Sequence, residues 1–290
     1  MKIKKAIITA AAPDQRKLPL QTLIDRDRTK KTVLEILINE IRSAGIDEIG
    51  IVIQPDDEKS FEQALGAVSG PGIKFIPQSK SKPGYGNAIL CGKEFLNGEP
   101  FLHLVGDHLY VNRKGENVAG QLIKLAEQSN CPVSEVQPTR ENLIGNYGTI
   151  KAIRIQGETD LFQIKKVTEK PTPAYAELHL MVPGMRAGYY LCFFGMHVFT
   201  PQLLEILERK ALSTPDARLG LSESLNELAG SSKYLAVIRN ESRYDIGLDY
   251  GLLKAQLALT LSGKDREALL AELLQFFVER DMNSNPETHE

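Results

Sequence analysis

Asp107 is the residue whose place in the sequence most suggests chemistry. It follows Gly106 and the apolar run Phe101–Val105, a pattern that predicts a buried central strand ending at a carboxylate. In open α/β sheets, ligands bind beyond the carboxyl ends of the strands, so we expect this carboxylate at a ligand site. The alternative is that Asp107 only begins a turn.

Other local patterns place glycine or charged residues at the end of an expected element. Each alone has a structural explanation, because glycines before a helix often only turn the chain and charged pairs after a strand are often solvated. Their order along the chain gives them weight together. They are the loop Arg16–Pro19, the helix opening Gly84-Tyr85-Gly86, the segment Glu169-Lys170-Pro171 and the late segment Tyr244-Asp245-Ile246-Gly247.

The elements that position these residues alternate in the first half of the chain. Thr32 is expected to cap a helix over Val33–Ser43, which Gly45 ends. A strand on either side of this helix implies parallel pairing. The alternation continues and predicts an α/β fold with a doubly wound, mostly parallel, Rossmann-like sheet. The expected strands are 6–12, 49–53, 73–77, 101–105 and 132–137, and the further helices are 56–68, 88–96 and 118–128.

After Thr139 the pattern changes to an inserted antiparallel β region followed by C-terminal helices. The last helix carries a wide apolar face, which either packs on the domain or meets a second subunit. The expected strands are 147–155, 161–171, 187–199 and 234–239, and the expected helices are 201–209, 221–228, 249–261 and 266–280. We predict a single domain over residues 1–281 and a disordered tail at 282–290.

Composition excludes several classes of protein. The chain has 290 residues and a formal net charge of −2, which gives no global field to attract nucleic acid. Cys91, Cys131 and Cys192 are far apart, which argues against a disulfide framework or a zinc site. No segment looks like a signal peptide or a membrane span. We therefore expect a cytoplasmic protein that binds neither nucleic acid nor a membrane.

Taken in order, these patterns resemble the sugar-1-phosphate nucleotidyltransferases, and most of all the bacterial UTP–glucose-1-phosphate uridylyltransferases (UDP-glucose pyrophosphorylases). The segments AGIDEIGIVI, GYGNAILCGKEF and VTEKP carry much of the likeness, which spans roughly residues 4–260. It implies a Mg²⁺-dependent enzyme that makes UDP-glucose and pyrophosphate from UTP and glucose 1-phosphate. It also implies a nucleotide-binding half over about 1–140, a sugar-binding half over about 141–262 and a C-terminal helix at about 265–280.

The resemblance assigns roles residue by residue. Asp107 and Asp245 correspond to the metal-binding aspartates, and Arg16 to the arginine that holds the triphosphate. Lys170 corresponds to the lysine at the sugar phosphate, so Arg16, Lys170 and Asp107 are the expected catalytic residues. The remaining correspondences are Ala11 and Ala12 with the nucleotide-binding loop, Gln78 with the residue that reads uracil, Gly84 and Gly86 with the backbone against the nucleoside, and Gly148 and Glu169 with the sugar site.

The N-terminal loop departs from the family pattern Gly-x-Gly-Thr-Arg-x-x-Pro, because it reads Ala12-Pro13-Asp14-Gln15-Arg16. Glycines let backbone N–H groups point at phosphates, whereas Pro13 has no N–H to offer. Asp14 would add a like charge, which costs about 4 kcal/mol at roughly 4 Å and an effective dielectric near 20. The family's loop lysine is also missing, and the possible substitutes are Arg26, Arg28, Lys30 and Lys31.

The physical argument for the transfer reaction is independent of the likeness. Joining a sugar phosphate to a nucleotide gathers negative charges, so positioning and neutralisation by Mg²⁺, Lys and Arg supply most of the catalysis. The altered loop leaves open a nucleotide-sugar-binding or regulatory protein without turnover. A third alternative is a transferase with another base, such as thymidylyl, or another sugar, because a few contacts near Gln78 set the base. We interpret His103 and His108 as structural residues. A homo-oligomer is possible through the last helix.

Overall fold

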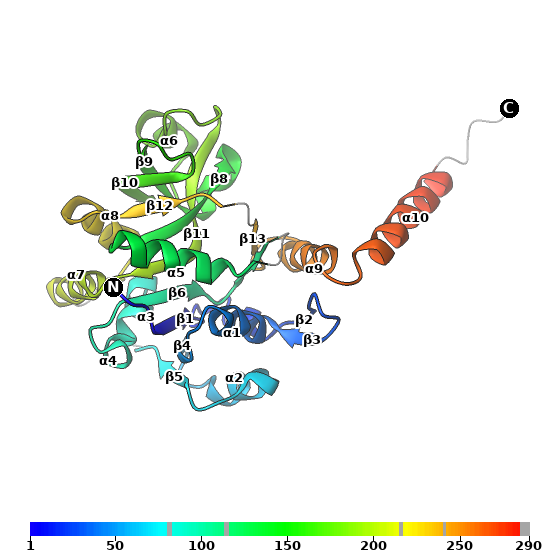
Figure 1. Cartoon of the computed structure of the whole chain (residues 1–290), viewed down its shortest axis with the longest axis horizontal. Coiled ribbons are helices and arrows are strands. Elements are labelled where there is room, and N and C mark those ends of the chain that lie inside the picture. The colour runs from blue at the N-terminus through cyan, green and yellow to red at the C-terminus, as the bar shows by residue number, and fades with distance from the viewer. Residues whose placement is uncertain (80–82, 113–115, 215–216, 240–241, 285–290) are drawn as a thin grey trace.

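Four parallel strands form one half of a nine-stranded sheet (Figure 1). The computed structural model describes residues 1–79, 83–112, 116–214, 217–239 and 242–284. β1 and β6 are almost wholly buried, as their mainly apolar sequences predict. The parallel strands lie in the order β5 (Ile73–Pro77), β4 (Glu48–Ile53), β1 (Lys5–Thr9) and β6 (Phe101–Val105).

The other half of the sheet is mainly antiparallel. β11 (Tyr189–Phe199) lies between β6 and β8 (Val133–Arg140) and runs antiparallel to both. β8 then pairs in parallel with β12 (Leu235–Val237), and β10 (Leu161–Glu169) and β9 (Gly148–Arg154) complete the sheet in antiparallel orientation. The antiparallel region expected after Thr139 is therefore present, and its longest strand separates β6 from β8.

Helices cover both faces of the sheet, which confirms the doubly wound α/β class. α1 (Val33–Ser43) and α5 (Val118–Ser129) share a core with one face. α3 (Tyr85–Cys91), α7 (Pro201–Ser213) and α8 (Ser222–Ser231) share a core with the other. α1 begins at a capping box between Thr32 and Glu35, which satisfies backbone N–H groups that a helix N-terminus otherwise leaves unpaired.

Short elements complete the connections between these layers. β7 (His108–Val111) and β13 (Ser242–Asp245) form a separate antiparallel pair directly after β6. The others are η1 (Leu18–Leu20), β2 (Thr22–Ile24), β3 (Lys30–Thr32), α2 (Glu58–Ala64), η2 (Gly66–Val68), α4 (Lys93–Leu96), η3 (Glu141–Asn146) and α6 (Pro173–His179).

The C-terminal helices are α9 (Gly251–Leu261), which contributes to the core, and α10 (Arg266–Ser284), which projects away from the body (Figure 1, red). Phe276 and Phe277 on α10 are 55% and 57% exposed. α10 continues past the expected end at 280 into the segment expected as a tail, whereas residues 285–290 lie outside the described ranges. Within those ranges, no helix combines the length and the apolar character needed to cross a membrane.

Candidate active site

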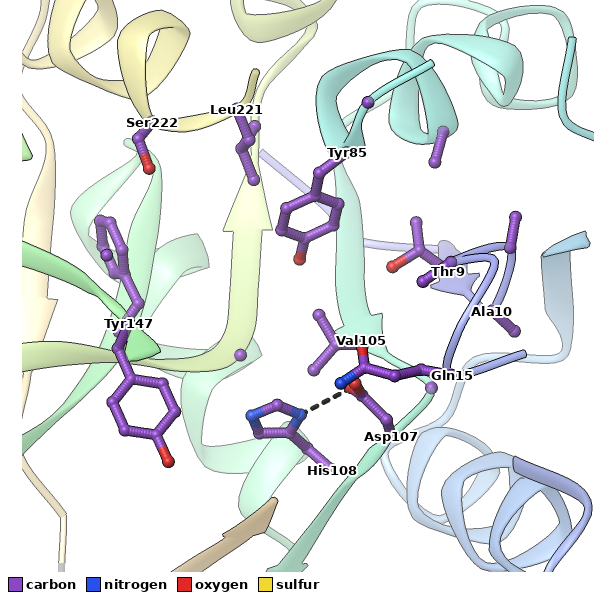
Figure 2. Close-up of a pocket in the computed structure, with 18 of the residues that line it drawn as sticks. Thr9, Ala10, Gln15, Tyr85, Val105, Asp107, His108, Tyr147, Leu221 and Ser222 are labelled. Atoms are coloured by element: carbon purple, nitrogen blue, oxygen red, sulfur yellow. Dashed lines mark hydrogen bonds and ion pairs between the residues drawn. The ribbon is translucent and has the colours of Figure 1, made fainter. Parts of the chain in front are cut away.

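A cleft of about 540 Å³ opens at the carboxyl ends of β1 and β6 (Figure 2). This is the edge of the sheet at which an open α/β fold binds ligands. Residues expected from the sequence to bind substrates form a large part of its lining. They are Ala11, Ala12, Gln78, Gly84, Asp107, Gly148, Glu169, Lys170 and Asp245.

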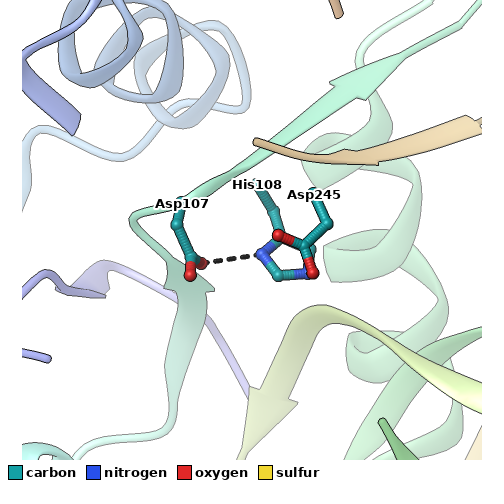
Figure 3. A group of neighbouring side chains, drawn as sticks. All are labelled: Asp107, His108 and Asp245. Carbon is teal, nitrogen blue, oxygen red and sulfur yellow. Dashed lines mark hydrogen bonds and ion pairs between the residues drawn. The ribbon is translucent and has the colours of Figure 1, made fainter. Parts of the chain in front are cut away.

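Asp107, His108 and Asp245 line the cleft and form a compact group (Figure 3). One possible ligand atom from each side chain lies within 4.8 Å of the others. The β7–β13 pairing places Asp245 opposite His108, and the backbone N–H of Ile246 donates to the carbonyl of Asp107 at 3.0 Å. Two carboxylates far apart in the sequence therefore meet because β13 returns to the end of β6.

The Asp107 carboxyl group is favoured in its ionised form. Burial by itself raises its pKa, but the neighbouring His108 and Arg243 and a backbone hydrogen bond lower it, and the net pKa is below the usual value. His108 Nδ1 donates to Asp107 Oδ1 at 2.7 Å. The side chains of Asp107 and Asp245 are only 18% and 11% exposed, so both carboxylates are largely shielded from water.

The donor set fits a divalent cation. The residues that could hold it are Asp107 and Asp245, whose carboxylate oxygens suit a hard ion such as Mg²⁺. His108 adds an imidazole nitrogen to the same group. We expected His108 to be a structural residue. Its ring instead lies at the cleft between both carboxylates (Figure 3), where it can also contact a ligand.

Arg243 is a cleft residue that the sequence analysis missed. Its guanidinium carbon lies 3.8 Å from the centre of the Tyr147 ring, and the group donates a hydrogen bond to the carbonyl of Phe193. Arg243 and Asp245 are two residues apart in β13, so their side chains leave the strand on the same side. The two-residue spacing between Arg243 and Asp245 could have indicated from the sequence that Arg243 lies on the same side of the strand as the carboxylate. Arg218, Tyr147 and Ser222 also line the cleft without having been expected there.

The expected sugar-binding residues converge where β9 and β10 begin and end. Gly148 pairs with Glu169 across the two strands, and the Ser222 hydroxyl donates to Glu169 Oε2 at 2.5 Å. A Cβ atom at Gly148 would come within 3.0 Å of Phe193 and 3.5 Å of Glu169 Oε2. Lys170 follows with an exposed side chain at the cleft. These contacts leave a lysine and a carboxylate facing one site.

The glycines that open α3 bring two chain segments together. Gln78 Nε2 donates to the carbonyl of Gly84 at 3.1 Å, and Gly86 N donates to the carbonyl of Leu219 at 3.0 Å. Gly84 has a φ of +126°, and a Cβ there would lie 2.3 Å from the Leu219 carbonyl oxygen. Gly84 lines the cleft, whereas Gly86, expected at the nucleoside, packs against residues 219 and 220 and is not one of the described lining residues.

The N-terminal loop differs from the expectation at Arg16. Arg16 pairs with Asp57, with 3.2 Å between Nη1 and Oδ1, and among the described residues it is not part of the cleft lining. The reason is local: the loop contributes Pro13 and Gln15 to the cleft, and the next side chain leads away toward the start of α2. Asp14 is exposed and also outside the described lining of the cleft.

The basic residues considered as substitutes for the missing loop lysine make other contacts. Arg26 donates to the carbonyl of Tyr110, Arg28 pairs with Asp265, and Lys31 contacts Asp25 and Asp27. Lys30 is exposed on β3. The cations that the structure places in the described part of the cleft are Lys170, Arg218 and Arg243.

His103 has the structural role that the sequence suggested. It is fully buried, its Nε2 lies 3.2 Å from Thr9 Oγ1, and its ring lies 5.7 Å from the ring of His197. Burial lowers the pKa of His103 to about 3. The ring is therefore neutral at ordinary pH. It packs behind Thr9, which lines the cleft.

Comparisons with known proteins agree with this fold and show the family. The family model described as nucleotidyl transferase matches residues 26–261. A UTP–glucose-1-phosphate uridylyltransferase from Streptococcus pneumoniae is 24% identical over 286 residues, covering 90% of this chain and 91% of that protein. The enzyme of the same name from Pseudomonas aeruginosa is 24% identical over 278 residues, covering 87% and 94%. The likeness stated from the sequence motifs is thereby confirmed.

Solved structures with the same fold include a UDP-glucose pyrophosphorylase in complex with UDP-glucose, with a TM-score of 0.71, 21% identity and coverage of 88% of this chain and 98% of that one. Another is the UDP-glucose pyrophosphorylase of Acinetobacter baumannii, with a TM-score of 0.71, 20% identity and coverage of 95% and 99%. Because the family model spans most of the sequence, the chain belongs to the nucleotidyl transferase family.

Proposed function

We propose that the protein transfers a uridylyl group from UTP to a sugar 1-phosphate, with glucose 1-phosphate as the expected acceptor, and releases pyrophosphate. One observation carries the proposal: Asp107 and Asp245 meet in a cleft that Lys170 and Arg243 also line. This combination of paired carboxylates and cations suits a reaction between two phosphate groups. The names of the relatives support the choice of UTP and glucose 1-phosphate.

The chemistry follows from the charges that must be brought together. An oxygen of the sugar phosphate attacks the α-phosphorus of the nucleotide, a new P–O bond forms, and the bond to the pyrophosphate leaving group breaks. Lys170, which lines the cleft beside Glu169, would hold the sugar phosphate, while Arg243 would offset the negative charge of the phosphates near the carboxylates. Positioning two anions in this way removes much of the entropic barrier.

A divalent cation, expected as Mg²⁺, would be held by Asp107 and Asp245. When bound, such an ion neutralises the phosphate oxygens and orients them. The residues themselves supply the other requirements. Glu169, which accepts a hydrogen bond from the Ser222 hydroxyl, would accept hydrogen bonds from sugar hydroxyls. Gln78, whose side chain donates to the carbonyl of Gly84, would contact the base.

Pyrophosphate release tests the proposal directly. Glucose 1-phosphate is offered with each of the four common nucleoside triphosphates and Mg²⁺, and Asp107→Asn is assayed beside the unchanged protein. We expect release with UTP and its loss in Asp107→Asn. The matched control is Asp47→Asn, an exposed aspartate before β4, which should keep full activity. Release that survives in Asp107→Asn would contradict the assignment, and release only with a triphosphate other than UTP would change the base.

A second candidate is a nucleotide-sugar-binding protein without turnover. The observation that favours it is the Arg16–Asp57 ion pair, which holds the expected triphosphate-binding arginine outside the described cleft lining. The sugar and diphosphate side of the cleft keeps its cations. Calorimetry with UDP-glucose separates the candidates, because this reading requires binding of UDP-glucose together with no pyrophosphate release at any triphosphate concentration.

A further inference from the structure

The imidazole of His108 lies between the two carboxylates that we assign to the cation. Its Nδ1 is 2.7 Å from Asp107 Oδ1, and its Nε2 is 3.8 Å from Asp245 Oδ2. We propose that His108 is a third ligand of this cation and that it shifts the metal preference of the site from Mg²⁺ toward Mn²⁺ and Co²⁺. The inference rests on the metal site of the proposed function.

The distances allow one ion to contact both His108 and Asp245. Metal–nitrogen and metal–oxygen bonds are about 2.1 Å long, so one ion can bridge two ligand atoms that are up to about 4.2 Å apart. The separation of 3.8 Å between Nε2 and Oδ2 is within that reach. The ligand atoms of all three residues lie within 4.8 Å of one another, which small side-chain rotations would shorten to a coordination sphere.

The contact with Asp107 orients the ring for this role. Since Nδ1 donates to the Asp107 carboxylate, the lone pair of the neutral imidazole is on Nε2, the atom that faces Asp245. A ligating histidine usually has its other ring nitrogen bound to a carboxylate or carbonyl, which fixes the tautomer and the ring plane. Asp107 keeps its second oxygen, Oδ2, for the cation.

The surrounding backbone holds the ring in place. His108 begins β7 and is paired with Asp245 on β13, and its side chain is only 11% exposed. A Cβ atom at Gly195, on β11, would lie 3.4 Å from His108 Cδ2 and 2.7 Å from Val105 Cγ2. Gly195, with a φ of +87°, thus leaves the space that the imidazole occupies beside the cleft.

The chemistry of the donors sets the metal preference. Mg²⁺ prefers oxygen ligands in near-ideal octahedral geometry, whereas imidazole nitrogen suits first-row transition ions, whose affinities rise from Mn²⁺ to Co²⁺. If the two carboxylates were the only protein ligands, Mg²⁺ would still compete with Mn²⁺ and Co²⁺ for the site. Adding a nitrogen donor favours Mn²⁺ and Co²⁺ over Mg²⁺ at the same site.

Pulsed electron paramagnetic resonance of bound Mn²⁺ tests the ligand directly and needs no turnover. The full chain is loaded with Mn²⁺ without substrates, and modulation from a histidine ¹⁴N nucleus is recorded. We expect the modulation in the unchanged protein, its loss in His108→Asn, and its retention in His179→Asn. His179 is an exposed histidine on α6, so this control removes the same group away from the cleft.

Competition titrations give the second readout. We expect the preference for Mn²⁺ over Mg²⁺ to fall about tenfold or more in His108→Asn, with no change in His179→Asn. Bound Mn²⁺ without ¹⁴N modulation in the unchanged protein, or modulation that persists in His108→Asn, would overturn the proposal. These results would leave the transferase assignment standing, because that is decided by pyrophosphate release. Absence of Mn²⁺ binding would overturn both the third ligand and the metal site.

Discussion

The guanidinium group of Arg243 lies against the ring of Tyr147, with 3.8 Å between the guanidinium carbon and the ring centre. A cation stacked on an aromatic face loses little freedom when it binds a further group. The hydrogen bond from Arg243 to the Phe193 carbonyl fixes it on a second side. The cleft therefore contains an oriented positive charge beside the Asp107 carboxylate.

Arg243→Gln should reduce kcat/KM for uridylyl transfer by about 100-fold or more, because it removes a fixed positive charge from a site that gathers phosphates. Steady-state pyrophosphate release measures the effect. Lys165→Gln is the matched control, since it removes an exposed positive charge on β10 outside the described lining of the cleft, and it should stay close to the unchanged protein. A loss of less than fivefold in Arg243→Gln would show that the charge is not used.

Arg16→Gln should have a much smaller effect on kcat/KM than Arg243→Gln, less than about threefold, because the Arg16 side chain is held at Asp57. The pair is partly exposed, so its loss should cost no more than about 1 kcal/mol in the free energy of unfolding. Asp57→Asn should behave in the same way. A 100-fold loss in Arg16→Gln with full activity in Asp57→Asn would mean that Arg16 turns into the cleft.

Gly84→Ala should destabilise the fold by about 2 kcal/mol or more, since its φ of +126° is open almost only to glycine and a Cβ would lie 2.3 Å from the Leu219 carbonyl oxygen. Urea unfolding measures the change. Gly145→Ala is the control, because nothing lies within 4 Å of its added Cβ, and it should stay within about 0.5 kcal/mol. Equal free energies of unfolding of the two variants would show that residues 219–220 move without cost to make room for the added Cβ atom.

His103→Gln should make the protein less sensitive to acid. Burial holds the pKa of His103 at about 3, so between pH 6.5 and 3 the unfolded chain takes up a proton that the folded chain does not. Stability from this residue is therefore complete above about pH 6.5 and is lost as the pH falls.

Urea unfolding at pH 7.5 and pH 5.5 measures this dependence. The unchanged protein should lose about 1.4 kcal/mol more than His103→Gln between these two values. His179→Asn removes an exposed histidine and should keep the pH dependence of the unchanged protein. The same loss in His103→Gln as in the unchanged protein would refute a neutral buried His103.

Local sequence determined most of the elements of this protein. The apolar runs around β1, β4 and β6, and the capped stripe of α1, appear where hydrophobic periodicity predicts them. Asp107 at the end of β6 was found in the same way, because a buried strand that stops at Gly106-Asp107 presents its carboxylate at the sheet edge. These features depend on neighbours in the sequence.

Contacts between distant segments were decided only by the tertiary structure. β11 separates β6 from β8, and β13 returns to pair with β7, which brings Arg243 and Asp245 to Asp107 and His108. Arg16 has the spacing of a family motif, yet its direction depends on the path of the loop toward Asp57. Strand order and side-chain direction depend on packing between segments that are distant in the sequence. Local sequence patterns do not show which distant segments pack together.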